Sequence, residues 1–364
     1  MIYTSSDKLN IAFIFGSASS EYEISCISCA SVLDNVDYEK YNVVKLGISR
    51  DNYWFIYSGE NRNIADASWE MDAERLTPVT LSLDSPKKGL YTLKAGSIVS
   101  FVPVDCVFPV MHGKFGEDGR IQGLFDLAGI PVCGCGSLSS GLCMDKVITK
   151  TLCERASIPC GKFASFTAPE YLADAAAIGA KLETLGYPLF IKPANAGSSV
   201  GITKVRAAHE LPEAISEAAK HDRKILAESF CKGKEIEVSV LGNPFGTVPV
   251  IASVCGEIAP HADFYDYNTK YINDTAEYFI PAHISETTSD KVRALALEVF
   301  ATLECSGFAR IDFFVDEDSD TVVFNEINNI PGFTAISMYA KLMRQEGYSF
   351  TALIDRIIEL AMER

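Results

Sequence analysis

The sequence lacks the features of a membrane-bound, secreted or nucleic-acid-binding protein. No apolar run approaches the roughly 20 residues that a membrane-spanning helix needs. The first ten residues, MIYTSSDKLN, do not show the basic-then-apolar order of a secretion signal. Positive charge is also scarce, since 32 Lys and Arg against 48 Asp and Glu give a formal net charge of -16, which opposes any partner with a phosphate backbone. We therefore expect a cytoplasmic protein with no nucleic-acid and no membrane partner.

The eleven cysteines have neither the number nor the spacing of a disulfide framework or a zinc site. An odd count without a secretion signal argues against systematic pairing. Cys26-Ile-Ser-Cys29 and Cys133-Gly-Cys135 are short and isolated, because no second Cys or His pair follows at a zinc-binding spacing. We expect buried free thiols and no metal on sulfur.

What the sequence does contain is the pattern of an open α/β protein. With 364 residues and 48% hydrophobic content, it can build two or three domains with large cores. The apolar run from Lys8 to Gly16 predicts a strand, and Ser20 with Glu23 forms a capping box that predicts the start of a helix. Glu21 would lie in the first helical turn at the carboxyl end of that strand, where open sheets bind ligands. The alternative for Glu21 is a surface acid that favours the helix N-terminus.

A second glycine-rich segment, HGKFGEDG, begins at His112. Its three glycines in eight residues give a backbone that can approach a ligand closely. His112 stands at a strand end and is not part of an apolar pattern. A structural polar residue with its hydrogen bonds satisfied and a group of the substrate site are therefore equally good interpretations of His112. Glu117 and Asp118 are expected to cap the helix that follows.

The middle of the chain carries candidates for phosphate and nucleotide contacts. Lys192 ends an apolar strand, and the loop ANAGSSVG that follows leads into another strand rather than a helix, unlike a P-loop. Glu228 ends a short strand, where it would accept a hydrogen bond from an adenine amino group or a sugar hydroxyl. The alternative is that Glu228 is a solvated acid at a strand end. The segment 261–282 has four tyrosines and poor periodicity, which predicts a functional lid that orders when nucleotide and substrate bind.

The stretch GFARIDFFVDEDSDTVVFNEINNIPGFT predicts a β-hairpin with a metal site. Two apolar runs flank an acidic turn at 316–320. A turn centred there places Asp312 opposite Glu326 and Arg310 opposite Asn328, with the four side chains on one face. Two carboxylates and an amide oxygen suit Mg²⁺, whereas the alternative is that these acids are simply solvated.

Six separated blocks, in this order, resemble the D-alanine:D-alanine ligase family of ATP-grasp enzymes over nearly the whole chain. The blocks are SSEYEIS, HGKFGEDGRIQGLFDLAGIP, SSGLCMDK, PLFIKPANAGSSVGITKV, DFYDYNTKYINDTAEYFIPA, and GFARIDFF with FNEINNIPGFT. The resemblance implies an α/β ATP-grasp fold with three α/β domains. These are an N-terminal open α/β domain at 1–134, a central ATP-grasp subdomain at 135–232, and a C-terminal subdomain with the metal and acceptor site at 233–364, with nucleotide held between the last two.

The resemblance also implies a reaction. The γ-phosphoryl group of ATP would pass to the carboxylate of a first D-alanine, and the amine of a second D-alanine would attack the resulting acyl phosphate, giving D-alanyl-D-alanine for peptidoglycan precursors. Glu21 would bind the first ammonium in a triad with Ser198 and Tyr271. Arg310 and the backbone N–H of Gly332 would stabilise the oxyanion.

Further residues receive roles from the same resemblance. The substrates would be bound by His112, Lys270, Ser337 and Met338. The phosphates would contact Lys146, Lys192 and a closing loop that includes Gly197 and Ser199, with Glu228 and Glu235 at the adenine and ribose end. Two Mg²⁺ ions, with Mn²⁺ as a substitute, would be held by Asp312, Glu326 and Asn328. A homodimer is also implied.

Three alternative functions share most of these blocks: D-serine ligases and D-lactate ligases of vancomycin-resistance type, and an ATP-binding module that has lost catalysis. The charged site residues are all present, which argues against lost catalysis. The Lys270-Tyr271 pair disfavours D-lactate, since the lactate ligases lack it. Met338 stands where the resistance-type ligases usually carry arginine, and Ala335-Ile336 replaces a Ser-His that is usual in the family. We predict D-alanine as the acceptor and retain D-serine as the alternative.

Overall fold

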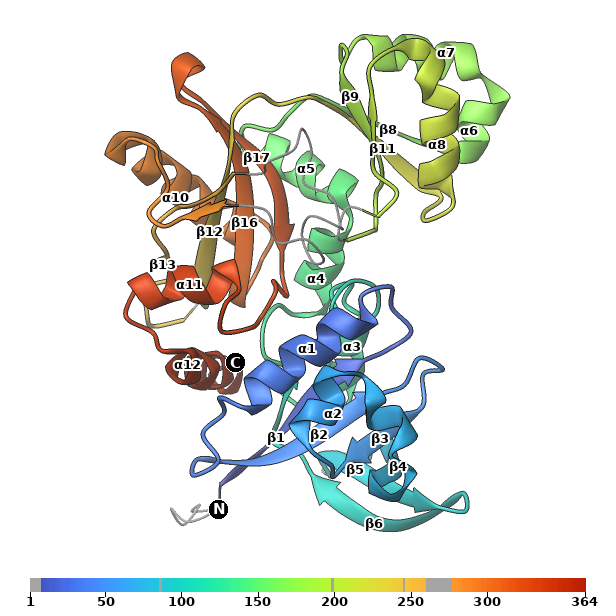
Figure 1. Ribbon diagram of the computed structural model, residues 1–364, viewed down its shortest axis with the longest axis vertical. Helices are drawn as coiled ribbons and strands as arrows, with labels where there is room; N and C mark the ends of the chain where they lie inside the picture. The colour runs from blue at the N-terminus through green and yellow to red at the C-terminus, as the bar shows by residue number, and fades with distance from the viewer. Residues whose placement is uncertain (1–7, 85–86, 198–199, 245, 260–276) are drawn as a thin grey trace.

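The computed structural model describes residues 8–84, 87–197, 200–244, 246–259 and 277–364, and their strands form three sheets that follow one another along the chain (Figure 1). The predicted domain limits fall between these sheets and stay predictions. Within the described ranges, no helix combines the length and the apolar character needed to cross a bilayer. The cysteines are free thiols, and all except Cys160 and Cys231 are buried, as expected for an interior role.

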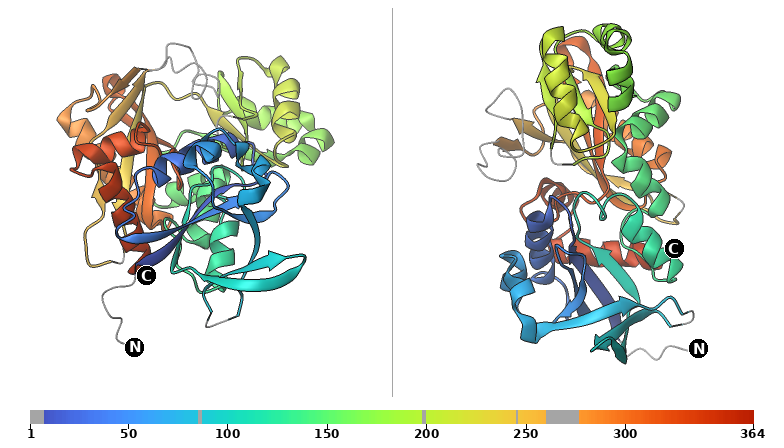
Figure 2. Two further views of the ribbon diagram at one scale, coloured as in Figure 1. Left: turned by 60° about the horizontal axis from the view of Figure 1, so that its bottom comes forward. Right: turned by 90° about the vertical axis from the view of Figure 1, so that its right-hand side faces the viewer.

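The first sheet carries the N-terminal site residues at the ends of its buried strands. Its order is β6-β5-β4-β3-β2-β1-β7, and β1 pairs in parallel with both β2 and β7. The continuous apolar run of β1 is buried on both faces, as a central parallel strand requires. The β5–β6 hairpin lies at the outer edge, away from the other sheets (Figure 2). The strands are β1 (Leu9–Gly16), β2 (Tyr41–Ile48), β3 (Trp54–Tyr57), β4 (Leu76–Leu81), β5 (Gly89–Lys94), β6 (Ser97–Pro103) and β7 (Cys106–Pro109), and the helices are α1 (Tyr22–Leu33), α2 (Asn61–Ala65) and α3 (Arg120–Leu127), with short 3₁₀ turns η1 (Ser68–Met71) and η2 (Ala73–Arg75).

Two helices, α4 (Ser137–Met144) and α5 (Lys146–Arg155), connect the first sheet to the second (Figure 1). Asp145 separates them and caps α5, because its carboxylate accepts from the backbone N–H groups of Val147 and Ile148. The second sheet has the order β10-β9-β11-β8, with all pairs antiparallel. Its elements are β8 (Phe163–Thr167), α6 (Ala168–Ala173), α7 (Ala175–Glu183), β9 (Leu189–Pro193), β10 (Thr203–Val205), η3 (Ala208–Glu210), α8 (Leu211–Ala219) and β11 (Lys224–Ser229).

The third sheet contains the predicted hairpin. Its order within the described residues is β15-β14-β12-β16-β17, and β13 also pairs with β12. In Figure 1, α10 and α11 lie beside it and α12 lies between it and the first sheet. The elements are β12 (Lys234–Gly242), β13 (Ile251–Ala252), β14 (Gly256–Ala259), β15 (Glu277–Phe279), α10 (Glu286–Thr302), β16 (Gly307–Asp316), η4 (Glu317–Ser319), β17 (Thr321–Asn328), α11 (Met338–Gln345) and α12 (Phe350–Met362).

The register of the β16–β17 hairpin is as predicted at the site end and shifted at the turn end. Arg310 pairs with Asn328 and Asp312 with Glu326, but the next pair is Phe313 with Phe324. Asn325 is therefore an extra residue in β17, a β-bulge. The bulge lies directly beside the polar cluster, which it separates from the apolar part of the hairpin.

The C-terminal helix ties the first and third sheets into one core. Apolar residues of α12 recur at helical spacing, and Ile354 and Ile357 are fully buried in the same cluster as Phe13 and Phe108 of the first sheet. Phe308 of β16 joins this cluster. This packing places the carboxyl ends of β1 and β7 next to the segment that follows β17, so the candidate site lies where distant parts of the chain meet.

Candidate active site

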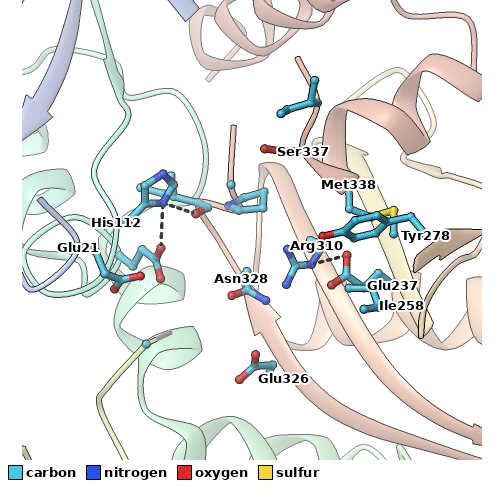
Figure 3. A pocket seen from close by; sticks show the side chains of 16 residues that line it. Glu21, His112, Glu237, Ile258, Tyr278, Arg310, Glu326, Asn328, Ser337 and Met338 are labelled. Carbon is cyan, nitrogen blue, oxygen red and sulfur yellow. Dashed lines mark hydrogen bonds and ion pairs between the residues drawn. The ribbon is translucent and has the colours of Figure 1, made fainter. Parts of the chain in front are cut away.

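One cavity of about 170 Å³ lies at this meeting point (Figure 3). Figure 3 shows Glu21 and His112 at one side, Arg310, Asn328 and Glu326 in the middle, and Met338 with Tyr278 at the other side. Of the residues predicted from sequence, the lining includes Glu21, His112, Gly197, Arg310, Glu326, Asn328, Gly332, Ser337 and Met338. Sequence reasoning did not assign a site role to the other lining residues, which are Glu117, Glu237, Ile258, Tyr278, Ile330, Pro331 and Ile336.

Glu21 lies between two glycines from different sheets. Glu21 is 6% exposed. A Cβ atom on Gly113 would lie 2.1 Å from Glu21 Oε2, and one on Gly197 would lie 2.9 Å from the same oxygen. Gly113 also has a positive φ of 69°, so glycine is required there for two reasons. The predicted capping box at Ser20 is wrong, since α1 begins at Tyr22 with Glu21 as its N-cap and without a side-chain cap hydrogen bond.

Glu23 takes no part in capping and instead pairs with Arg50 at 2.7 Å. An arginine brought close by the fold competes successfully with a local backbone donor for this carboxylate, because both partners are charged. The neighbouring segment 112–119 behaves partly as predicted. Asp118 accepts from the backbone N–H of Arg120 at the start of α3, but Glu117 turns into the cavity.

His112 is a hydrogen-bonded buried residue that also lines the cavity, and its role as a substrate-site group stays a prediction. It is 4% exposed, its Nδ1 is 3.2 Å from the carbonyl oxygen of Ile330, and its Nε2 is 3.1 Å from the hydroxyl of Ser28. It also lines the cavity, with Glu117 Oε1 3.6 Å from its Nδ1. Burial alone would lower the pKa of His112, but the Glu117 and Glu21 carboxylates and the Ile330 carbonyl together raise it, with Glu117 as the largest of these three.

Arg310 is held by two carboxylates in the middle of the cavity. Its Nε and Nη2 donate to the two oxygens of Asp312 at 2.8 Å and 2.7 Å, and Nε is 3.1 Å from Glu237 Oε2. Burial by itself would lower the pKa of Arg310, but the charges of Asp312 and Glu237 hold it well above its usual range. The alternation in β12 places Glu237 on the same strand face as the predicted Glu235, but only the pairing of β12 with β16 in the structure brings it to Arg310.

The three predicted metal ligands lie together, and they differ in whether they line the cavity. Glu326 and Asn328 line the cavity, whereas Asp312 lies behind them against Arg310 and accepts a 3.1 Å hydrogen bond from the Asn328 amide. No group of three or more His, Cys, Asp or Glu side chains in the described ranges is arranged to hold a metal. The available donors are nevertheless carboxylate and amide oxygens, which are the ligands that Mg²⁺ prefers.

The two predicted phosphate lysines lie beside the cavity on elements of the second sheet region. Lys146 donates to the carbonyl oxygen of Ala196 at 2.7 Å and lies 3.9 Å from Glu326. Lys192 is paired with Glu228 at 2.6 Å. Burial would raise the pKa of Glu228, but the lysines around it lower that pKa to about 2, so this acid is charged and paired rather than solvated.

The remaining end of the cavity combines a helix N-terminus with apolar walls. Ser337 is the N-cap residue of α11, and its hydroxyl accepts from the backbone N–H of Thr334 at 3.1 Å. Met338 is 6% exposed and packs with Ile258, with Tyr278 partly buried against them. Met338 was predicted and Tyr278 belongs to the predicted lid segment 261–282, whereas no sequence pattern pointed to Ile258 on β14.

Four predicted site residues lie outside the described residues: Ser198, Ser199, Lys270 and Tyr271. The same is true of most of the predicted lid at 261–282, of which only 277–282 is described. Glu235 is half-buried on β12, opposite Phe314, and is not part of the described lining of this cavity.

Comparison with known proteins connects this arrangement to one family. Residues 10–135 match the family described as D-ala D-ala ligase N-terminus, and residues 152–359 match D-ala D-ala ligase C-terminus. A D-alanine--D-alanine ligase of Acetivibrio thermocellus is 42% identical over 368 residues, covering 98% of this chain and 97% of the relative.

Two solved structures share the whole architecture. The crystal structure of the VanG D-Ala:D-Ser ligase from Enterococcus faecalis has a TM-score of 0.88 at 39% identity, covering 98% of this chain and all of that one. The D-alanine-D-alanine ligase from Coxiella burnetii has a TM-score of 0.85 at 31% identity, covering 99% and 95%. The expected ATP-grasp α/β fold is thus confirmed. With both family descriptions matched and similarity over the full length, this chain belongs to the D-alanine:D-alanine ligase family.

Proposed function

We propose that this protein ligates two D-alanines to D-alanyl-D-alanine at the expense of ATP, through an acyl phosphate, and so supplies peptidoglycan precursors. The observation that carries the proposal is that one cavity is lined by the carboxylate of Glu21, the guanidinium of Arg310 and Ser337 at the N-terminus of α11. These groups suit an ammonium, a reacting carboxyl group and a second carboxylate, respectively.

The residues of the cavity suit an acyl transfer between two amino acids. Glu21 would bind the ammonium of the first D-alanine, in a triad with Ser198 and Tyr271, and His112 would hold the rim of that subsite. Arg310 and the Gly332 N–H would donate to the oxyanion that forms when the second amine attacks. Such donors are effective here because two carboxylates already fix the guanidinium, so it needs little reorganisation during the reaction.

The acceptor end has features that suit a second D-alanine. The carboxylate of that amino acid would bind Ser337, Lys270 and the first N–H groups of α11, which favour anions. Its methyl group would face Met338, Ile258 and the other apolar residues of this wall.

We also propose that ATP and Mg²⁺ bind at the Glu326 side of the cavity. Lys146, Lys192 and the loop with Gly197 and Ser199 would hold the phosphates, with Glu228 and Glu235 toward the adenine and ribose. Asp312, Glu326 and Asn328 would hold two Mg²⁺, or Mn²⁺ as a substitute, and substrate phosphate oxygens would complete the coordination. When bound, the metal neutralises phosphate charge.

Product analysis tests the proposal directly. With ATP, Mg²⁺ and D-alanine the protein should release ADP and phosphate and form D-alanyl-D-alanine, whereas an ATP-binding module without catalysis would form none of these. Glu21→Gln should raise the KM for D-alanine strongly because it removes the ammonium's counter-charge. Glu23→Gln is the matched control, since Glu23 lies two residues away with an exposed side chain paired to Arg50, and it should retain wild-type kinetics. Equal kinetics of the two variants would contradict the role of Glu21.

D-Alanyl-D-serine synthesis is the second candidate. The fold similarity to the VanG D-Ala:D-Ser ligase supports it, because that enzyme is 39% identical over the same length. An assay with both acceptors present decides between the two products.

We further propose a cytoplasmic location and a homodimer. The location is supported by the free thiols, which a reducing compartment preserves, and by the need for ATP. Sedimentation of the purified protein tests the homodimer.

A further inference from the structure

Lys150 is a buried lysine to which the proposed reaction assigns no role. It lies one turn after Lys146 on α5, and its side chain is 3% exposed. Its Nζ is 2.6 Å from Glu228 Oε1 on β11 and donates a 2.9 Å hydrogen bond to the carbonyl oxygen of Asn325 on β17. A buried ammonium is costly unless it is paired, and these partners come from two different sheets. The Lys150 ammonium thus contacts a carboxylate of the second sheet and a backbone carbonyl oxygen of the third sheet at the same time.

On the side of the second sheet, Lys150 shares Glu228 with Lys192. The two lysines lie 2.6 Å from different oxygens of that carboxylate. If Lys192 moves to a phosphate group, Lys150 keeps Glu228 neutralised. Without Lys150, the same movement would leave a buried carboxylate unpaired, which is strongly unfavourable. Lys150 therefore lowers the free energy required to release Lys192.

On the side of the third sheet, Lys150 holds the bulge of β17. Asn325 is the extra residue between the pairs Asp312–Glu326 and Phe313–Phe324, so its carbonyl oxygen needs a donor other than the β16 ladder. Lys150 provides that donor, and its ammonium also lies 5.5 Å from the centre of the Phe324 ring. The peptide that Lys150 fixes leads directly into Glu326, which lines the cavity.

We propose that Lys150 is a positioning residue that couples nucleotide binding by Lys192 to the orientation of Glu326. This inference rests on the proposed function only in that it takes Lys192 and Glu326 as nucleotide and metal contacts. Two separate effects are expected in a variant that lacks the Lys150 ammonium. Nucleotide should bind more weakly because Lys192 stays with Glu228, and more Mg²⁺ should be needed because Glu326 is less fixed.

Calorimetric titration with ADP in the absence of D-alanine measures the first expectation without turnover. Lys150→Met should weaken ADP binding about 10- to 100-fold, by analogy with the effect of removing residues that orient the side chains holding a metal. Lys150→Arg should recover part of the loss, because it keeps the charge but not the geometry of an ammonium. Lys45→Met is the matched control, since Lys45 is a half-buried lysine that donates to the carbonyl oxygen of Gly59 in the first sheet, far from this cavity. It should bind ADP like the wild type.

A double-mutant cycle separates a coupling role from a merely structural one. In a Glu228→Gln background, Lys192 is no longer held by a charge, so Lys150→Met should then cost far less ADP affinity than it does alone. Equal losses in both backgrounds, or wild-type ADP binding by Lys150→Met, would overturn the proposal. If Lys150→Met shows no cooperative unfolding transition in urea, the same double-mutant cycle with Lys150→Arg in place of Lys150→Met tests the coupling.

The second expectation is measured as the Mg²⁺ concentration that gives half-maximal phosphate release. It should rise in Lys150→Met and stay at the wild-type value in Lys45→Met, and an unchanged value in both would overturn the link to Glu326. If the wild type makes no D-alanyl-D-alanine, the proposed function fails while the ADP titrations still test Lys150.

Discussion

The guanidinium of Arg310 donates to both carboxylate oxygens of Asp312, at 2.8 Å and 2.7 Å, although the two residues are expected to act on different parts of the reaction. Arg310 would stabilise the oxyanion and Asp312 would hold a metal. Their pairing means that a metal at Asp312 must share that carboxylate with Arg310. Glu237 on the neighbouring strand keeps the guanidinium in place when this happens.

Arg310→Lys should therefore lower kcat by about 100- to 1,000-fold, the cost of losing one preorganised oxyanion donor. A lysine retains the charge but cannot contact Asp312 with two nitrogens and still reach Glu237. The KM for ATP should change little, because the two proposed nucleotide lysines are held by other carboxylates, Lys146 by Glu326 and Lys192 by Glu228. Steady-state kinetics measure both constants. Arg293→Lys on α10 is the control, and comparable losses in the two variants would point to a general effect of the substitution.

Glu326→Gln should suppress phosphate release by orders of magnitude and leave the fold intact. The change removes a charge from the proposed Mg²⁺ site while keeping the size of the side chain. Asp316→Asn in the same hairpin is the matched control, since Asp316 pairs with the exposed Lys232 at the turn end. Near-normal turnover by Glu326→Gln at moderate Mg²⁺, with circular dichroism unchanged, would remove Glu326 from the metal site.

The hairpin shows what the sequence could and could not predict. The pairs Arg310–Asn328 and Asp312–Glu326 follow from the two-residue period of strands and a central turn. The bulge at Asn325 could not be foreseen, because an extra residue in a strand has no signature when the apolar pattern continues on both sides. It matters for the site, since its carbonyl oxygen is the one that Lys150 binds.

Residues brought together from distant segments were harder to predict than residues within one motif. Glu228 could be predicted as a strand-end acid, but its two lysine partners come from α5 and β9, whose packing the local pattern does not encode. The capping box at Ser20 failed for a similar reason, because Arg50 from another segment takes the Glu23 carboxylate. Family blocks marked the candidate site residues in the sequence, and the packing of the three sheets determined which of them touch.

Replacing Glu117 should change how stability depends on pH. Glu117 raises the pKa of His112, so the folded state binds that proton more tightly than the unfolded state does. The resulting stabilisation is fully present below the unfolded pKa of about 6.5 and is lost as pH rises through the folded pKa. Burial also raises the pKa of Glu117, which acts in the same direction. In Glu117→Gln the largest contribution that raises the His112 pKa is lost, so that pKa should fall and the decline in stability with pH should become smaller.

Urea unfolding at a series of pH values measures this dependence, and NMR titration of the His112 ring measures its cause. The other four of the five histidines serve as internal controls in the same spectra. Identical His112 titration in the wild type and Glu117→Gln would show that Glu117 does not set this pKa.

D-Alanine should be the preferred acceptor over D-serine, by a modest factor. The wall beside Ser337 is formed by Met338, Ile258 and Tyr278, with the Met338 side chain nearly buried. Met338 and Ile258 fit a methyl group and give a hydroxyl no strong hydrogen-bond partner, so the phenol of Tyr278 is the polar group that this wall offers. An apolar pocket alone rejects an added hydroxyl by only about 100-fold, which limits the expected preference. Mixed-acceptor assays near neutral pH, with both dipeptides quantified, measure it.

Met338→Gln should then raise the share of D-alanyl-D-serine, because an amide at this position offers the serine hydroxyl both a donor and an acceptor. The side chain keeps its length, so the wall should keep its shape. Met71→Gln is the matched control, since Met71 is 80% exposed outside the cavity and should leave the product ratio unchanged. If the wild type already makes mainly D-alanyl-D-serine, D-serine ligation replaces the first proposal. If Met338→Gln leaves the ratio where it was, Met338 does not select the acceptor.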